Sequence, residues 1–225
     1  MGADVRVGVI DSGCSREQTN GLLDARRFWL EDGQLREGAM LPDELGHGGA
    51  VLASLQREAG PVPLLVAQVF GGQASTSALQ VAAALLWLVE AGATLVNLSL
   101  GLQQDRPVLH QACAEALAAG VVLCASSPAQ GGPVFPASYP GVIRVTGDAR
   151  CAPGQWSWLG TRQADFGGYV GTGGRAGASL GCAALSGRIA ALLRAEPGMD
   201  RQRIHEWLRQ HATFSGPERR GASHA

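Results

Sequence analysis

The chain has 225 residues, a length that fits one α/β domain or at most two small ones. Hydrophobic residues make up 46% of it and charged residues 16%, a composition that excludes a disordered or coiled-coil chain. The formal net charge is −1. No strong electrostatic field therefore attracts nucleic acid or an acidic membrane surface, and we expect neither as a partner.

The start of the chain and its cysteines indicate the cellular compartment. The first residues run almost directly into an apolar segment, without the basic leader, long apolar stretch and cleavage site of a secretory signal. The longest apolar stretch, residues 81–89, is too short to span a membrane. The five cysteines form no CxxC pair and are typical of reduced, buried thiols. We expect a cytoplasmic protein with no metal site and no cofactor.

Short apolar strands alternate with helices along the chain. We expect strands at residues 5–10, 64–70, 94–100, 121–125 and 142–146, and helices at residues 48–57, 78–91, 107–119, 179–194 and 200–211. This alternation predicts a parallel sheet with helices on both faces. The chain has no internal repeat and no Pro-rich linker, so we expect one domain over residues 1–214 and a flexible tail over residues 215–225.

Three polar residues stand where such a fold places its ligand site, at the carboxyl ends of strands and the starts of helices. Asp11 follows the first strand directly, and by itself it is equally a turn residue. His47 lies at a loop-to-helix junction between glycines, a setting that none of the other four histidines shares. Ser179 begins a helix of small residues, where a lone serine is most simply a cap.

Together these residues suggest nucleophilic catalysis. A serine hydroxyl is a poor nucleophile until an imidazole takes its proton, and that imidazole needs a carboxylate to orient it. The backbone N–H of Ser179, at the positive end of a helix dipole, would face a developing oxyanion. Aspartate, then histidine, then serine is also the chain order of the subtilisin triad.

Five segments in the same order resemble the subtilisin-like serine peptidases. They are the aspartate motif at residues 11–13 (DSG), the histidine motif at 47–53 (HGGAVLA), the substrate-binding strand at 96–101 (VNLSLG), the lead into a core strand at 137–143 (ASYPGVI) and the serine motif at 177–181 (GASLG). The resemblance implies a single-domain, three-layer α/β fold with a mostly parallel sheet. It also implies endopeptidase activity in which Ser179 attacks, His47 acts as base and then acid, and Asp11 orients His47.

The resemblance further implies a groove in which an extended peptide pairs with the protein backbone. Ser99, Leu100 and Gly101 would line one side of this groove, and Ser126 and Ser127 the other. The small size of these residues leaves room for a substrate side chain.

The chain departs from the family pattern in places that affect catalysis. Gly49 and Ala178 stand where threonine is usual, and Ala183 replaces a proline. The family's asparagine, a second oxyanion donor, is missing from residues 125–130 (ASSPAQ). In subtilisin the loss of this donor costs about 10²–10³ in kcat. Gln130 and Ser127 are the candidates to replace it; the alternative is a donor from elsewhere in the chain or no side-chain donor at all.

Cys182, one helical turn beyond Ser179, is expected to be a core residue and not the nucleophile. The glycine-rich residues 171–174 raise the alternative of a nucleotide-binding protein. No strand clearly precedes them, however, and the chain has no lysine to complete a phosphate-binding loop.

In size and setting the chain resembles compact intracellular subtilases that lack a propeptide and remove leader peptides in maturation pathways. Among these are the small peptidases that process the γ-subunit of bacterial quinohemoprotein amine dehydrogenase. The resemblance implies a peptide or protein precursor as substrate, restrained cleavage, and a docking partner as one source of that restraint. Two alternatives remain open: a pseudo-peptidase that binds a peptide without turnover, and an intracellular enzyme of general protein degradation.

Overall fold

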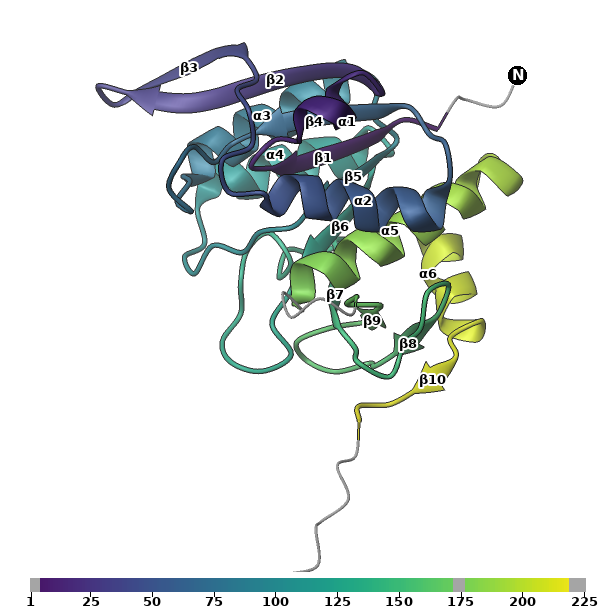
Figure 1. Ribbon diagram of the computed structural model, residues 1–225. Helices are drawn as coiled ribbons and strands as arrows, with labels where there is room; N and C mark the ends of the chain where they lie inside the picture. The colour runs from purple at the N-terminus through teal and green to yellow at the C-terminus, as the bar shows by residue number, and fades with distance from the viewer. Residues whose placement is uncertain (1–4, 172–176, 219–225) are drawn as a thin grey trace, which may run out of the picture.

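A computed structural model describes residues 5–171 and 177–218 (Figure 1). The elements are β1 (Val7–Asp11), α1 (Arg16–Thr19), β2 (Leu22–Glu31), β3 (Gln34–Ala39), α2 (His47–Ala59), β4 (Leu64–Gln68), α3 (Ala78–Glu90), β5 (Leu95–Leu98), α4 (Pro107–Ala118), β6 (Val122–Ser126), β7 (Ile143–Gly147), β8 (Trp156–Trp158), β9 (Phe166–Gly168), α5 (Ala178–Ala195), α6 (Arg201–Gln210) and β10 (Phe214–Ser215). Of the glycine-rich stretch 171–174, residues 172–174 lie outside the described residues.

These strands form one sheet in the order β10-β8-β9-β7-β6-β5-β1-β4-β2-β3. The pairs β2–β3 and β8–β9 are antiparallel, and the other pairs are parallel. Strands β1, β4, β5 and β6 are buried along their whole length, because helices cover both faces of a parallel sheet. The predicted single-domain, mostly parallel fold is confirmed.

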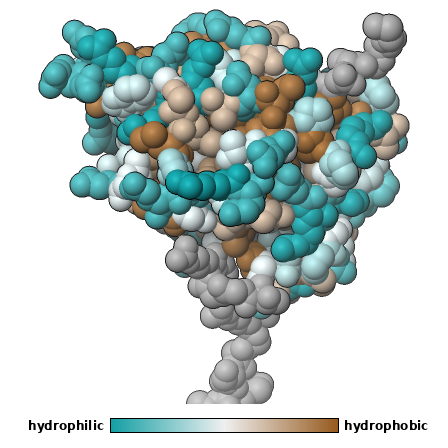
Figure 2. Space-filling view, turned by 45° about the horizontal axis from the view of Figure 1, so that its top comes forward, coloured by the Kyte–Doolittle hydropathy of each residue, from teal (hydrophilic) through white to brown (hydrophobic). Residues whose placement is uncertain are grey.

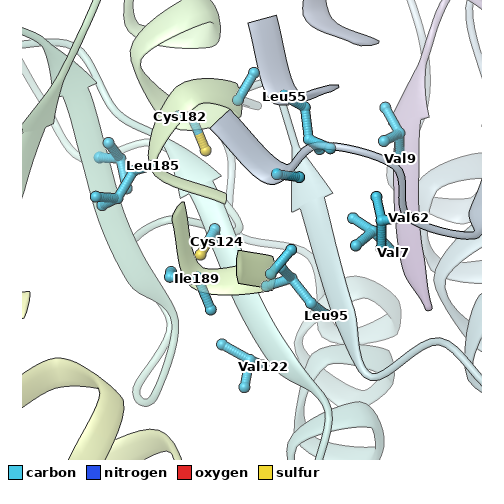
Figure 3. Close-up of a cluster of buried hydrophobic side chains, with 14 of the residues drawn as sticks. Val7, Val9, Leu55, Val62, Leu95, Val122, Cys124, Cys182, Leu185 and Ile189 are labelled. Atoms are coloured by element: carbon cyan, nitrogen blue, oxygen red, sulfur yellow. The ribbon is translucent and has the colours of Figure 1, made fainter. Parts of the chain in front are cut away.

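Side chains alternate between the two faces of the sheet and form two cores. Val7 and Val9 of β1 pack on the face covered by α2, α5 and α6 (Figure 3). Ile10 of the same strand packs on the opposite face, against α3 and α4. The helices and the sheet therefore make three layers, as predicted. The apolar helix α5 has the length and composition of a membrane span, but 61% of its residues are buried inside the domain, where it serves as a core helix.

Local signals set the helix starts that the sequence predicts. Ser77 forms a capping box with Gln80 at the start of α3. Asp200 caps α6 by accepting a hydrogen bond from the backbone of Arg203 at 2.8 Å. Pro107 occupies the first turn of α4.

The β2–β3 hairpin lies at the edge of the sheet and was not predicted. Its strands are largely exposed, so they lack the apolar run by which the buried strands are recognised. Asp32 and Gly33 join them with φ values of 51° and 74°, which matches the preference of a two-residue hairpin turn for Asp-Gly. Exposed leucines concentrate on the hairpin and just after it (Leu23, Leu30, Leu35 and Leu41). On the face seen in Figure 2, hydrophobic areas are small and interrupted by hydrophilic ones.

The expected tail boundary after residue 214 needs correction. Ser215 belongs to β10, which pairs with β8, and the N–H of Gly216 donates to the carbonyl oxygen of Trp158 at 2.8 Å. Arg150 donates to the carbonyl oxygen of Gly216 at 2.9 Å. Residues 215 and 216 are therefore part of the domain, and residues 219–225 lie outside the described residues.

Candidate active site

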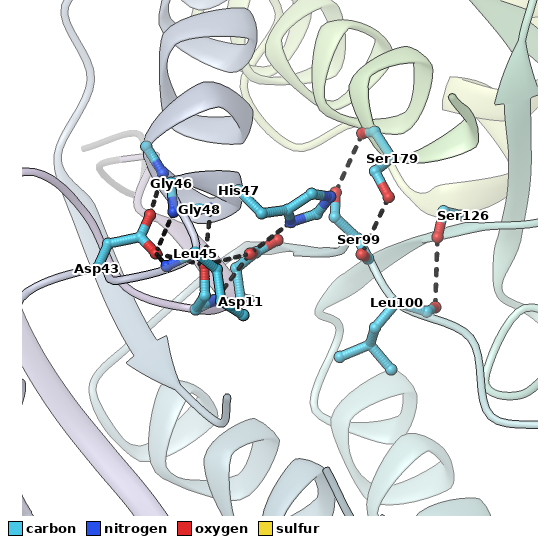
Figure 4. A network of polar contacts seen from close by, with 12 residues as sticks. Asp11, Asp43, Leu45, Gly46, His47, Gly48, Ser99, Leu100, Ser126 and Ser179 are labelled. Atoms are coloured by element: carbon cyan, nitrogen blue, oxygen red, sulfur yellow. Dashed lines mark hydrogen bonds and ion pairs between the residues drawn. The ribbon is translucent and has the colours of Figure 1, made fainter. Parts of the chain in front are cut away.

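The polar residues singled out by the sequence meet at one edge of the sheet. Asp11 is the last residue of β1, His47 is the first residue of α2, and Ser179 lies in the first turn of α5. The close-up in Figure 4 shows the His47 ring between Asp11 on one side and Ser99 and Ser179 on the other. The topology therefore brings together three side chains that are far apart along the chain.

A buried carboxylate orients the imidazole. His47 Nδ1 lies 2.7 Å from Oδ1 of Asp11, whose side chain is fully buried, whereas the His47 side chain is 43% exposed. The backbone N–H of Ser12 donates to the same carboxylate oxygen at 2.7 Å. The other oxygen, Oδ2, has no hydrogen-bond partner among residues 5–171 and 177–218. Asp11 thus accepts from His47 through an oxygen that the backbone also holds in place.

A second carboxylate, which the sequence analysis missed, fixes the start of the histidine helix. Asp43 accepts hydrogen bonds from the backbone N–H groups of Leu45, Gly46 and Gly49 at 3.1, 2.8 and 3.0 Å. These donors surround His47, so Asp43 determines where α2 begins and how its first residue is presented. The detectable signal is an acidic residue four positions before the histidine, at a helix N-terminus.

Ser12 and Gly48 join the aspartate loop to the histidine helix. The Ser12 hydroxyl donates to Asp43 at 2.8 Å and accepts from the backbone N–H of Gly48 at 2.9 Å. A Cβ on Gly48 would collide with the carbonyl oxygen of Gly13. Only glycine at position 48 permits this close approach, which brings the His47 ring within reach of Asp11.

Two hydrogen bonds join Ser179 to the loop that follows β5. Its hydroxyl donates to the carbonyl oxygen of Ser99 at 3.1 Å, and the Ser99 hydroxyl donates to the carbonyl oxygen of Ser179 at 3.1 Å (Figure 4). The backbone N–H of Ser179 belongs to the first turn of α5, where N–H groups have no acceptor within the helix. That N–H lies at the positive end of the helix dipole.

A cavity of about 520 Å³ adjoins this edge of the sheet. Asp11 and His47 line it, together with the predicted groove residues Ser99, Leu100 and Gly101. The apolar side chains Leu45, Phe70 and Leu102 form part of its wall. The structure therefore places one predicted side of the substrate groove directly beside the imidazole.

The second predicted side of the groove, Ser126 and Ser127, lies at the end of the neighbouring strand β6. The Ser126 hydroxyl donates to the carbonyl oxygen of Leu100 at 3.3 Å, so the two sides touch at this point (Figure 4). Ser127 is buried, and its backbone N–H donates to the carbonyl oxygen of Val145 at 2.8 Å. Within the described part of the chain, no hydrogen bond engages the Ser127 hydroxyl.

Gln130, the other candidate oxyanion donor, is exposed and lines a different cavity of about 580 Å³. That cavity lies at the carboxyl end of β7, where Thr146 and Asp148 contribute to its wall. It does not contain Asp11 or His47. The structure therefore does not bring Gln130 to the cavity that holds the imidazole.

Known proteins give the context for this arrangement. No protein-family model matches the chain. The chain is 30% identical over 155 residues to alkaline elastase YaB of Bacillus sp. strain YaB, an alignment that covers 64% of this chain and 39% of the elastase. It is 27% identical over 164 residues to the major intracellular serine protease of Bacillus subtilis strain 168, covering 64% of this chain and 51% of that protein.

Solved structures agree with these relatives. A cold adapted subtilisin-like serine proteinase superimposes with a TM-score of 0.71 at 19% identity, covering 93% of this chain and 82% of that one. The chain is thus similar in sequence to two Bacillus proteases, and it has the fold of a subtilisin-like serine proteinase. A lanthipeptide protease superimposes with a TM-score of 0.70 at 16% identity, covering 93% and 80% of the two chains. This chain spans about half or less of the length of the two curated relatives.

The thiols near the site are buried and inert. Burial raises the pKa of Cys182 well above its usual value, and raises that of Cys124 to about 12. Neither sulfur carries an appreciable thiolate population near neutral pH, so neither thiol is a candidate nucleophile. The expectation that Cys182 is a core residue is confirmed. Among residues 5–171 and 177–218, no cluster of three or more His, Cys, Asp or Glu side chains is placed to hold a metal ion.

Proposed function

We propose that this chain is a serine endopeptidase in which Asp11, His47 and Ser179 form the catalytic triad. The observation that carries the proposal is the 2.7 Å contact between the buried Asp11 carboxylate and His47 Nδ1, at the same sheet edge as Ser179. The carboxylate holds Nδ1–H, so that Nε2 of the neutral imidazole is the proton acceptor. Homology to serine proteases supports the same role for these residues.

The reaction begins with a rotation of the Ser179 side chain. Its hydroxyl leaves the Ser99 carbonyl oxygen and turns to Nε2 of His47, which takes the proton as Oγ attacks the peptide carbonyl carbon. The resulting imidazolium is stabilised by Asp11 and gives its proton to the leaving amine as the C–N bond breaks. Water, activated by the same imidazole, then hydrolyses the acyl-enzyme and regenerates Ser179.

The oxyanion is stabilised by the backbone N–H of Ser179 at the start of α5. The Ser127 hydroxyl is the better candidate for a second donor, because it lies at the end of β6 and no bond within the described residues engages it. A hydroxyl reaches less far than the amide of asparagine. We therefore propose a lower kcat than that of relatives with the asparagine.

The substrate is an extended peptide that pairs with residues 99–101 as an added strand. We propose that it belongs to a precursor cut at one site to release a leader. The weakened oxyanion hole supports such restraint, and a lanthipeptide protease shares the fold. A docking partner of the precursor would supply further selectivity. A cytoplasmic setting is supported by the similarity to an intracellular serine protease and by five free, buried cysteines.

The alternative is a pseudo-peptidase that binds a peptide without turnover, which the missing asparagine favours. A fluorophosphonate probe separates the two, because it reacts only with an activated serine. We expect intact-mass spectrometry to show one adduct on the wild-type chain, mapped to Ser179, and none on Ser179→Ala. A correctly folded wild-type chain that stays unlabelled would leave the binding protein as the better description.

A second assay separates selective cleavage from general degradation. We expect the unlabelled wild-type chain to leave casein and generic peptides largely intact, while it cuts its own precursor at one bond. Rapid degradation of casein by the wild-type chain, but not by Ser179→Ala, would contradict a restrained peptidase and favour a general protein-degrading enzyme.

A further inference from the structure

A line of buried hydrogen bonds runs beneath Ser179. The Ser186 hydroxyl donates to Oδ1 of Asn97 at 3.0 Å, and Nδ2 of Asn97 donates to the Ser99 hydroxyl at 2.9 Å. The Ser99 hydroxyl in turn donates to the carbonyl oxygen of Ser179 at 3.1 Å. Asn97 and Ser186 are fully buried, and Ser99 is 4% exposed.

The direction of this line is fixed by its chemistry. A hydroxyl has one proton to donate, and Ser99 accepts from the Asn97 amide, so its own proton is committed to the Ser179 carbonyl. Buried polar groups in a low-dielectric interior are costly to leave unpaired. Each residue therefore fixes the hydrogen-bond direction of the next, from Ser186 through Asn97 and Ser99 to the Ser179 carbonyl.

These hydrogen bonds also connect helix α5 at two points to strand β5 and the residue that follows it. Ser186 lies seven residues after Ser179, about two turns along α5 and hence on the same face. Asn97 belongs to β5, and Ser99 directly follows the end of that strand. The bonds thus leave α5 at Ser186, cross to β5, and return to α5 at Ser179, which fixes the first turn of the helix against the strand.

We propose that Asn97 and Ser186 are positioning residues for the nucleophile, acting through Ser99. The inference rests on the proposed peptidase function. Ser99 holds Ser179 at both ends, through its hydroxyl on the Ser179 carbonyl and through its carbonyl on the Ser179 hydroxyl. The same bonds set the direction of the Ser179 N–H, which matters more where the oxyanion hole lacks the asparagine.

The first test compares two hydroxyls that hold adjacent carbonyls. Ser99→Ala removes the bond to Ser179 but keeps the backbone of the groove. Ser54→Ala is the matched control, because Ser54 is also buried and donates to the carbonyl oxygen of Leu180 at 3.2 Å. We expect Ser99→Ala to lower kcat by about 10- to 100-fold with little change in KM, the cost of a misplaced reacting group. Ser54→Ala should keep a kcat near the wild-type value.

The second test uses pH to form or break the hydrogen bond from residue 97 to the Ser99 hydroxyl. In Asn97→Asp the carboxyl group still accepts from Ser186, but it donates to Ser99 only while it is protonated. Burial raises the pKa of such a carboxyl group, which brings its titration toward the working range of the enzyme. We expect the ratio of Asn97→Asp to wild-type kcat to rise as pH falls. Asn97→Leu, of similar size, should show a low ratio that does not change with pH.

A third readout does not depend on activity. In a crystal structure of Ser99→Ala we expect the Ser179 carbonyl and the first turn of α5 to shift away from residue 99, because the mutation removes the bond to that carbonyl and keeps the one to the Ser179 hydroxyl. If Ser99→Ala and Ser54→Ala have equal kcat, or the Asn97→Asp ratio is flat, the positioning role is wrong and the peptidase stands. If the wild-type chain does not react with the fluorophosphonate, the peptidase is wrong. The comparison of the two crystal structures then decides about Ser99 alone: an unchanged position of the Ser179 backbone overturns the positioning role as well.

Discussion

The two halves of the site are built with opposite chemistry. On the side of β1 and α2, two carboxylates accept hydrogen bonds from backbone N–H groups: Asp11 also holds the imidazole, and Asp43 holds the backbone around His47. On the side of β5 and α5, neutral groups hold Ser179: hydroxyls, one amide and backbone carbonyls. The half that receives a proton needs a negative charge nearby, whereas the half that attacks needs direction without a charge that would oppose the oxyanion.

Removing the charge from the first half should have the largest effect. Asp11→Asn keeps the shape of the side chain but no longer holds Nδ1–H of His47, so the imidazole adopts the wrong tautomer. By analogy with the corresponding change in other serine proteases, we expect kcat to fall by about 10⁴. Steady-state kinetics on a cleaved peptide measures this, with circular dichroism to show that the fold is retained. If kcat of Asp11→Asn fell by no more than kcat of Ser99→Ala, the charged half of the site would contribute no more to catalysis than the neutral half.

The support of the charged half is tested by Asp43→Ala. We expect the free energy of unfolding to drop by about 1–2 kcal/mol, because three backbone N–H groups around the start of α2 lose their acceptor. Activity should fall as well, because α2 presents His47. Ser77→Ala is the matched control, since Ser77 caps α3, which packs on the opposite face of the sheet. It should cost similar stability in urea unfolding without altering kcat. Equal kcat values in the two variants would show that Asp43 stabilises the fold but does not position His47.

The neutral half contains a sulfur that should prove dispensable. Cys182 is fully buried below Ser179, and burial raises the pKa of its thiol well above the usual value. We expect Cys182→Ala to lower stability by about 1 kcal/mol while fluorophosphonate labelling persists. Thiol reagents at neutral pH should leave the native wild-type protein unmodified and active. Loss of labelling in a folded Cys182→Ala variant would contradict this assignment.

The smallest effect is expected away from both halves, at Asp148 beyond the end of β7. Burial by itself would raise the pKa of Asp148, but hydrogen bonds from Arg150 and Ser157 outweigh it and hold the pKa below its usual value. A carboxyl group with a lowered folded-state pKa adds stability above its unfolded value, near pH 4, and loses it as pH falls through the folded-state pKa.

The pH dependence of unfolding measures this contribution. We expect the wild-type free energy of unfolding to decline below about pH 4 more steeply than that of Asp148→Asn. Urea titrations at several pH values make the comparison, and fluorophosphonate labelling near neutral pH should be similar in both proteins. Parallel pH curves for the two proteins would show that Asp148 contributes no such linkage.

The sequence was sufficient for those parts of the molecule whose signals are local. Apolar runs revealed the central strands and the helices between them, and the structure shows Ser77, Pro107 and Asp200 at three of the helix starts. The residues of the proposed triad were singled out because parallel strands bring their carboxyl ends to one edge, so that Asp11 could be related to a helix start far along the chain.

The remaining features depend on backbone groups or on tertiary placement. Asp43 acts on backbone N–H groups, which leave no mark in the sequence beyond an acidic residue near a helix start. The link from Ser186 to Asn97 joins residues 89 positions apart, and only the packing of α5 on β5 brings them together. The β2–β3 hairpin was missed because half-exposed strands alternate too weakly, although its Asp32–Gly33 turn was a usable signal.

Strand β10 has a practical consequence for handling the protein. It is the outermost strand beside β8, and the N–H groups of Thr213 and Gly216 donate to the carbonyl oxygens of Trp156 and Trp158. A shortened version ending before Thr213 would leave those carbonyls open to pairing between molecules, a common start of aggregation. An affinity tag should therefore follow residue 218 and not replace the residues before it.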